Sequence, residues 1–282
     1  MRLDAYVAKY WPEQSRSLWS KLIKQGYVKV NEVIQTSPKL KVGEDDVVTV
    51  DTLPVVGLGD NTLPVVYEDE HVVVINKPSG ILTHAKGALT EEFSVAEFVR
   101  PIQNETDNSN RPGIVHRLDR ATSGVIICSK DNETKRLLQK QFQDRKAHKT
   151  YLAIVDGQPK LNEARINLPI ERNPKNPSCF RVGSKGKPAI TNYRVLACSE
   201  NYSVVELTPS TGRTHQLRVH LAYLGCPIVG DTLYGGSQSP LGRLCLHASQ
   251  LEITIPPGQR RTFEAALPTD FKQFLSKLGH EA

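Results

Sequence analysis

Short apolar runs with strand-like composition recur through this chain and constrain its fold more than any other feature of the sequence. Helical patterns fall between some of the runs, but the two do not alternate regularly. A parallel sheet built from βαβ units requires that alternation, whereas strands without it form an α+β domain. We therefore expect an α+β fold whose main domain has a largely antiparallel mixed sheet flanked by helices and loops, with strands at Val72–Ile75, Val125–Cys128, Tyr151–Val155, Thr191–Ala197, Val204–Leu207 and Leu251–Ile255.

Amphipathic patterns and capping residues predict the helices of this main domain. Clusters of polar residues, glycine and proline predict its surface loops. The expected helices run from a cap at Asp131 to about Phe142, from Thr214 to Leu224 with Gly225 at the end, and onward from Thr269; the expected loops are 104–111 and 171–188.

The first 50 residues have their own pattern and predict a small α/β domain. Residues 51–63 hold one proline and two glycines without a clear period, which is typical of a linker, and residues 64–282 form the larger domain. The expected elements of the small domain are a helix over Leu3–Tyr10, a helix over Arg16–Gln25 capped by Ser15, and short strands at Tyr27–Val30 and Val47–Val50.

One side of the second of these helices is basic, because Arg16, Lys21 and Lys24 share it. Such a face is either an ordinary solvated surface or a contact for a polyanion. The chain as a whole carries a net charge of +6, which favours polyanionic partners without establishing them.

Several classes of protein are excluded by what the sequence lacks. It has no apolar run of the roughly 18 residues that span a bilayer, and its N-terminus has no signal-peptide core. The five cysteines are widely spaced without a CxxC pair, which argues against a disulfide framework and a zinc site and for a reduced, cytoplasmic protein. Phosphate-binding glycine motifs and a GxSxG elbow are absent, so we expect no cofactor. His215 and His220 are five residues apart and do not share a helix face, as a metal-binding pair at i and i+4 would, so we expect no metal.

Two polar clusters stand out against this background. The first surrounds Asp119, whose carboxylate lies between Arg117 and Arg120 on an irregular segment that leads into a strand. It is either a functional acid or an aspartate that hydrogen-bonds its own turn. The second cluster places Arg213 and Arg218 at the opening of a helix, where they could hold a buried carboxylate or an RNA phosphate, or be ordinary surface arginines.

Together these segments resemble the RluA/RluD-type family of RNA pseudouridine synthases, which isomerise uridine in ribosomal RNA. The motifs HRLD-x-x-TSG and GRTHQLRVH, in this order, are highly specific. The resemblance rests on residues 75–80 (INKPSG), 116–124 (HRLDRATSG), 149–151 (KTY), 212–220 (GRTHQLRVH), 230–235 (GDTLYG) and 246–248 (LHA).

The first 50 residues resemble the S4 RNA-binding domain that precedes the catalytic domain in many members of that family. Segments that carry this likeness include 15–17 (SRS) and 28–31 (VKVN), and Glu32 replaces the glycine that usually follows the asparagine. In such a domain the basic helix face, with Arg16, Lys21 and Lys24, would contact RNA.

The resemblance implies a role for individual residues. Asp119 is then the essential catalytic aspartate, which attacks the sugar, attacks the base, or removes a ribose proton to give a glycal; we favour the glycal route. Arg213 matches the position that pairs with the aspartate, and Tyr151 matches the tyrosine that packs on the uracil. Arg117 matches the arginine that fills the space left by the flipped nucleotide. Arg120, Arg218 and the apolar Leu217 are further candidates for substrate contact.

The expected function is therefore isomerisation of specific uridines to pseudouridine, most readily in large-subunit ribosomal RNA, by a cytoplasmic monomer without a cofactor. The same chemistry on tRNA is an alternative. A non-catalytic S4-domain ribosome assembly factor is another, although a pure binder would not need Asp119, Tyr151 and Arg213 together.

Overall fold

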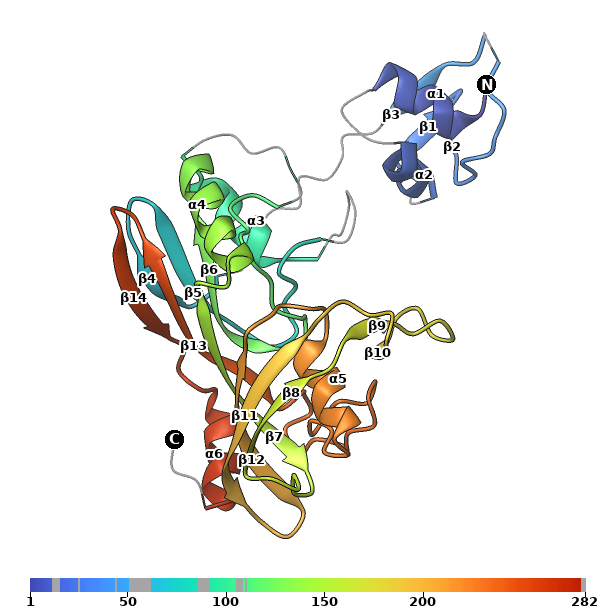
Figure 1. The fold of residues 1–282 in the computed structure, drawn as a ribbon. Coiled ribbons are helices and arrows are strands. Elements are labelled where there is room, and N and C mark those ends of the chain that lie inside the picture. Colours follow the sequence, from blue (N-terminus) through green and yellow to red (C-terminus); the bar gives the residue numbers. More distant parts are fainter. Residues whose placement is uncertain are drawn as a thin grey trace. The chain divides into compact units, whose positions relative to one another are not determined.

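A computed structural model of the protein describes residues 1–11, 16–24, 26–43, 45–50, 62–85, 92–104, 109 and 111–279, without the side chains of residues 17, 18 and 21 (Figure 1). The chain divides into two compact units, one formed by Met1–Asn61 with Ala85–Phe93 and the other by Thr62–His84 with Ser94–Ala282. Of the expected linker at 51–63, only Thr62 and Leu63 lie within the described residues, so the domain boundaries stay predictions.

The first unit contains the two expected helices and a small antiparallel sheet of order β2-β1-β3. Leu3 and Val7 of one helix and Trp19, Leu22 and Ile23 of the other share a single core with the sheet. The predicted cap Ser15 and helix end Gln25 lie outside the described residues. The elements are α1 (Leu3–Tyr10), α2 (Arg16–Lys24), β1 (Val28–Val30), β2 (Val33–Ile34) and β3 (Val48–Val50).

The turn between β1 and β2 explains how glutamate is accommodated where glycine is usual. Asn31 and Glu32 have φ angles of 51° and 66°, so both occupy the left-handed region. Val30 pairs with Val33, which makes the connection a two-residue hairpin, and such hairpins require this conformation. The turn keeps a left-handed backbone, and β2, which the sequence did not predict, is its second strand.

The second unit is built on one large sheet, and this confirms the expected α+β fold. Its strands follow the order β4-β5-β6-β13-β7-β12-β11-β8, with β14 paired to β13. Every pairing is antiparallel except that of β13 with β6. The strands are β4 (Val65–Glu68), β5 (Val72–Lys77), β6 (Ser123–Ser129), β7 (His148–Asp156), β8 (Glu163–Asn167), β11 (Ile190–Cys198), β12 (Tyr202–Pro209), β13 (Leu246–Ile255) and β14 (Gln259–Glu264).

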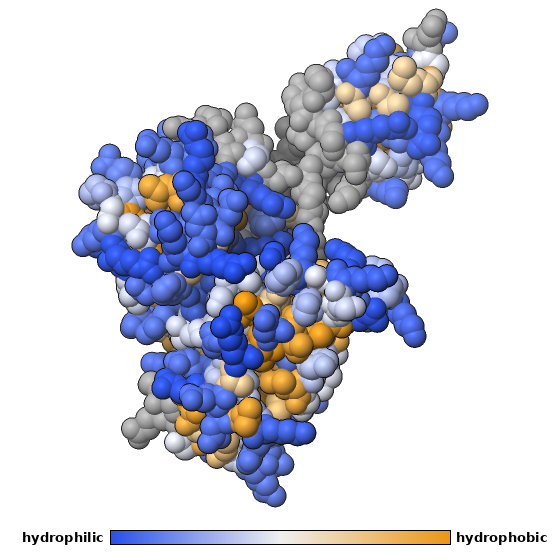
Figure 2. Space-filling view, in the orientation of Figure 1, coloured by the Kyte–Doolittle hydropathy of each residue, from blue (hydrophilic) through white to orange (hydrophobic). Residues whose placement is uncertain are grey.

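The helices of this unit lie at two places along the sheet (Figure 1). α3 (Val95–Val99) and α4 (Asn132–Gln143) lie near β5 and β6, and the surface over α4 is largely hydrophilic (Figure 2). Near β7 and β12, α5 (Gln216–Tyr223) and α6 (Thr269–Lys277) contribute apolar side chains to the main core. Asp131 caps α4 as expected, because its carboxylate accepts hydrogen bonds from the backbone N–H and the hydroxyl of Thr134.

Two expectations about this unit are wrong in detail. The segment 171–188 is not only loop, because β9 (Ile170–Arg172) pairs with β10 (Phe180–Val182). Three-residue strands among proline, asparagine and glycine have no apolar period to reveal them. The helix expected from Thr214 begins at Gln216, because His215 has a φ of 56° and cannot continue a right-handed helix.

The parallel contact between β6 and β13 fixes the strand that follows the Asp119 segment. Gly124 lies so close to β13 that an added Cβ atom would be 2.2 Å from the carbonyl oxygen of Ala248, and its φ is +118°. Beside it, the fully buried imidazole of His247 hydrogen-bonds Ser123 Oγ at 2.9 Å and the carbonyl of Ala265 at 3.1 Å. Glycine is therefore required in the TSG motif for packing.

Acid is expected to destabilise the second unit through His247. Burial, partly opposed by the bond to Ala265, lowers the pKa of His247 to about 4, below its unfolded value of 6.5. The unfolded chain then binds the extra proton between these values, so the free energy of unfolding falls as the pH is lowered through 6.5 towards 4. We expect about 2 kcal/mol of this loss between pH 7 and pH 5, measured by urea unfolding. A His247→Gln variant that loses as much stability over that range would contradict the assignment.

The helices in the described parts of the chain are all too short or too polar to cross a lipid bilayer.

Candidate active site

The segment that carries Asp119 is fixed by hydrogen bonds to the residues that precede the aspartate. Leu118, just before it, exchanges two bonds with the hydroxyl of Thr83, at 2.8 and 3.2 Å. The Nε2 atom of His116 accepts a bond from the backbone N–H of Ile127, and its ring stacks on Phe142 with 4.5 Å between ring centroids. The carboxylate is therefore presented from a rigid loop.

Lys77, the lysine of the INKPSG motif, lies beneath this loop. Its ammonium group is fully buried and donates to the carbonyl oxygens of Pro78, Ile81 and Arg120, at 2.9, 2.8 and 3.2 Å. Burial lowers the pKa of Lys77 to about 7, against the opposing effect of the Asp119 charge. The residue links β5 to the Asp119 loop, a role that the sequence reasoning did not assign.

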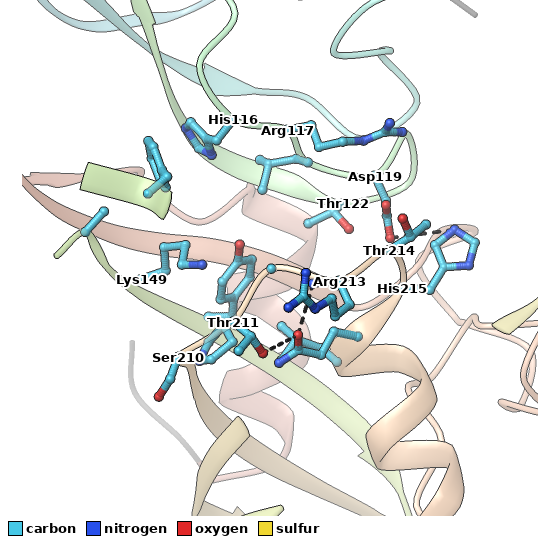
Figure 3. A pocket seen from close by; sticks show the side chains of 18 of the residues that line it. His116, Arg117, Asp119, Thr122, Lys149, Ser210, Thr211, Arg213, Thr214 and His215 are labelled. Carbon is cyan, nitrogen blue, oxygen red and sulfur yellow. Dashed lines mark hydrogen bonds and ion pairs between the residues drawn. The ribbon is translucent and has the colours of Figure 1, made fainter. Parts of the chain in front are cut away.

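A guanidinium and an imidazole approach the carboxylate. Arg218 Nη1 and His215 Nε2 lie 3.7 and 3.9 Å from Asp119 Oδ2, and Figure 3 shows the carboxylate directed towards His215. Burial lowers the pKa of His215, while the charge of Asp119 acts in the opposite direction. Its Nδ1 hydrogen-bonds the hydroxyl of Tyr234 at 2.7 Å. The hydrogen bond with Tyr234 therefore orients the imidazole towards Asp119.

Arg218 is held by a second carboxylate. Its Nε and Nη2 atoms donate to the two oxygens of Asp231 at 2.7 and 2.8 Å, and the side chain of Asp231 is fully buried. This bidentate geometry leaves Nη1 facing Asp119. The aspartate of the GDTLYG motif therefore aims the cation at the candidate catalytic group.

Asp119 opens onto a cavity of about 540 Å³ (Figure 3). Tyr151 and Lys149, both on β7, contribute to its wall together with the loop before α5. Burial, reinforced by the Asp119 charge, raises the pKa of Tyr151, so its phenol is protonated at neutral pH. Burial also lowers the pKa of Lys149 to about 8. Its wall mixes apolar side chains, such as Phe142 and Leu246, with many polar and charged ones, and its size is typical of a small-ligand site.

The structure brings most of the sequence candidates of the second unit to this cavity: Asp119, Tyr151, Arg213, Arg117, Leu217 and Arg218 all line it. Arg120 is not among the lining residues, and its Nε donates to the carbonyl of Gly80 at 3.0 Å. In the first unit, Arg16 pairs with Asp4 at 3.2 Å, Lys24 is exposed, and the side chain of Lys21 lies outside the described residues.

The expected pairing of Arg213 with the aspartate needs correction. Arg213 Nε donates to the carbonyl oxygen of Pro188 at 3.1 Å, and its backbone N–H donates to Gln216. Among the described residues, the arginine that pairs with Asp119 is Arg218, five positions later. α5 begins only after the left-handed residue His215, and Arg218 in its first turn lies against the carboxylate beside the His215 imidazole.

Comparison with known proteins agrees with this geometry. The sequence model described as RNA pseudouridylate synthase matches residues 71–223, more than half of the chain and nearly all of the cavity wall. The chain belongs to the RNA pseudouridylate synthase family. The S4 domain model matches residues 1–48, which confirms the expected character of the first unit.

Relatives of this family align along almost the whole chain. An uncharacterized RNA pseudouridine synthase of Aquifex aeolicus is 37% identical over 98% of this chain and 93% of its own length. Ribosomal large subunit pseudouridine synthase D of Borreliella burgdorferi is 36% identical over 98% and 89%, respectively. Among solved structures, human RNA pseudouridylate synthase domain containing 4 superposes with a TM-score of 0.63 at 27% identity, covering 78% of this chain and 94% of the human one.

Groups of three or more potential metal ligands are absent from the described residues. His220, which the sequence analysis considered with His215 as a metal ligand, is buried and hydrogen-bonds Thr191 and the carbonyl of Leu168. Lys77, His215, Asp231 and Lys149 were missed as site residues, although each belongs to one of the quoted motifs.

Proposed function

We propose that this RNA pseudouridine synthase isomerises specific uridines in large-subunit ribosomal RNA, with Asp119 as its catalytic residue. The observation that carries the proposal is the meeting of Asp119 and Tyr151 in one cavity, with the guanidinium of Arg218 against the carboxylate. The name of the Borreliella burgdorferi relative supports the large-subunit RNA as substrate.

The reaction exchanges one glycosidic bond for another and has no net loss or gain of atoms. The bond between ribose C1′ and uracil N1 breaks, the uracil rotates, and C1′ joins C5. C5 then loses its hydrogen as a proton, and N1 gains a proton, so that the formula is unchanged. In the glycal route, the Asp119 carboxylate takes a ribose proton as the first bond breaks and returns it later. Arg218 places a positive charge beside the carboxylate that carries out this step.

The target uridine has to leave the RNA stack to enter the cavity, at a cost of a few kcal/mol. Arg117 is exposed at the rim, where its guanidinium can fill the space that the base leaves. Tyr151 and Leu217 offer faces for the uracil, and Arg213 supplies a cation to the same cavity. We retain these residues as substrate contacts, with Arg120 as a contact outside the cavity.

Replacing Tyr151 with phenylalanine is expected to slow product formation by about 10²-fold while RNA binding is retained. The ring still packs on the uracil, but the hydroxyl that relays the C5 proton is lost. Because the phenol is protonated at neutral pH, it can accept that proton only by passing its own onward. Single-turnover pseudouridine formation measures the effect, and a wild-type rate in this variant would exclude the phenol as a proton carrier.

The RNA class is tested by tritium release from transcripts labelled at uracil C5. Release from a large-subunit ribosomal RNA transcript and none from bulk tRNA transcripts is expected. The S4-like unit supports the larger RNA, because added cations such as Arg16, Lys21 and Lys24 extend the contact with phosphates. Release from tRNA alone would show that the substrate is tRNA, while the proposed reaction would still hold. We also propose that the domain boundaries are 1–50, 51–63 and 64–282, and that the protein is a cytoplasmic monomer.

A further inference from the structure

A second cavity of about 570 Å³ lies in the same unit, and its wall is basic. Arg111, Arg117 and Lys135 contribute to it, and none of the described residues that line it is acidic. Lys135, on α4, donates from Nζ to the carbonyl oxygen of Arg111 at 3.1 Å, so the two basic residues are held together. A cavity with this charge attracts an anionic ligand.

This second cavity adjoins the site already described. His116 and Arg117 line both cavities, so they form the ridge between them. α4 contributes to both as well, with Lys135 and Gln139 in the second cavity and Gln143 in the first. A flexible chain that enters one cavity therefore reaches the other by crossing a single pair of residues.

The second cavity also contains an imidazole nitrogen without a partner. His84 is 7% exposed, and its Nδ1 makes no hydrogen bond in the part of the chain that the structure describes. Burial, with the charges of Arg111 and Arg117, lowers the pKa of His84 to about 4, so the ring is neutral at pH 7. A buried polar atom without a partner costs free energy that a ligand can recover.

The position of His84 is fixed relative to Asp119. Thr83, the residue before it, makes the two hydrogen bonds to Leu118, the residue before Asp119. The unpartnered imidazole and the candidate catalytic carboxylate are thus mounted on two chain segments that are bonded to each other. A ligand held at His84 is therefore held in register with the reaction.

We propose that the second cavity binds a backbone phosphate of the RNA strand that delivers the uridine, with Arg111 and Lys135 as its cations and His84 as a hydrogen-bond donor from Nδ1. This inference rests on the proposed function, since the phosphate belongs to the same RNA. The strand crosses the ridge of His116 and Arg117, with the target base in the first cavity and a neighbouring phosphate in the second.

The test is the salt dependence of RNA binding by a Lys135→Gln variant of the full chain. Each phosphate contact contributes about 0.7 to 0.9 to the slope of log affinity against log salt concentration. We expect this variant to bind a large-subunit ribosomal RNA transcript several-fold more weakly, with a slope smaller in magnitude by that amount. Arg111→Gln is expected to have the same effect. Lys135 stays in place in this variant, because it is bonded to the backbone carbonyl of residue 111.

Lys272→Gln on α6 is the matched control, because Lys272 is exposed, lines neither cavity and carries the same charge. It is expected to keep the wild-type slope. In single-turnover assays Lys135→Gln should need more RNA for half-maximal rate and reach the wild-type maximum. Slopes in both cavity variants equal to that of Lys272→Gln would overturn the phosphate site.

Ethylation interference identifies the phosphate. Ethylating one phosphate near the target uridine should weaken binding of the wild-type protein and have little further effect on Lys135→Gln. Equal interference in both proteins would overturn the assignment. Tritium release by the wild-type protein separates this proposal from the proposed function: without release the isomerase proposal fails, whereas a lost contact in Lys135→Gln still reports a phosphate in the second cavity.

Discussion

Replacing Arg218 with glutamine is expected to lower both the turnover number and the stability of the protein. Two carboxylates depend on its guanidinium, since Asp231 is bound to it by two hydrogen bonds and Asp119 faces it at 3.7 Å. Glutamine leaves the fully buried Asp231 without a cation, which costs about 3 to 5 kcal/mol. It also removes the positive charge beside the Asp119 carboxylate, and we expect turnover to fall by about 10²- to 10³-fold.

Stability and catalysis can be separated with a second substitution. The double variant Arg218→Gln with Asp231→Asn removes the unpaired buried charge, so its free energy of unfolding should recover much of the loss. Its turnover should remain low because Asp119 still lacks its cation. Urea unfolding and single-turnover assays on both variants decide the matter. If turnover recovered together with stability, Arg218 would act only through folding.

Replacing Asp119 with asparagine is expected to abolish turnover and leave the fold intact. The side chain is partly exposed, at 20%, and it faces a cavity, so a neutral amide of the same shape fits without a buried cost. Asparagine cannot take up a proton or act as a nucleophile at neutral pH, and we expect a loss of about 10³-fold or more. RNA affinity should remain close to that of the wild-type protein, measured by filter binding.

An aspartate that only hydrogen-bonds its own turn would behave differently. The Asp119 loop is fixed by backbone and side-chain bonds from Thr83, His116 and Lys77, none of which uses the Asp119 carboxylate. An unchanged unfolding midpoint in Asp119→Asn would therefore agree with a catalytic role. A large loss of stability would instead support the structural interpretation.

Much of the fold could be predicted from the sequence, because its central strands are long and apolar. The run Val125–Cys128 lies within β6, whose residues are all buried. A strand buried on both faces can be recognised from a continuous apolar run, without alternation of apolar and polar residues. β9 and β10 could not be identified, because they are short and make a separate two-stranded sheet. Edge elements of this kind depend on tertiary contacts that no local pattern reports.

The candidate site was predictable in its residues and not in all its contacts. Asp119 and Tyr151 are far apart in the sequence, and only their motifs indicated that they meet. The choice between Arg213 and Arg218 depends on the left-handed turn at His215, a conformation that the sequence gives no sign of. Lys77 and Asp231 were missed for another reason. Lys77 donates to backbone carbonyl oxygens of the Asp119 loop and Asp231 binds the Arg218 guanidinium, and such contacts leave no periodic pattern in the sequence.

The most direct measurement follows tritium at uracil C5 in a large-subunit ribosomal RNA transcript, with wild-type protein and Asp119→Asn side by side. Formation of the C5–C1′ bond expels that hydrogen, so release reports the isomerisation itself. We predict release by the wild-type protein, with pseudouridine appearing in equal amount, and none by Asp119→Asn at equal RNA binding. Release by both proteins would show that Asp119 is not the catalytic group. No release by the wild-type protein, from this RNA or from tRNA, would contradict the proposed function.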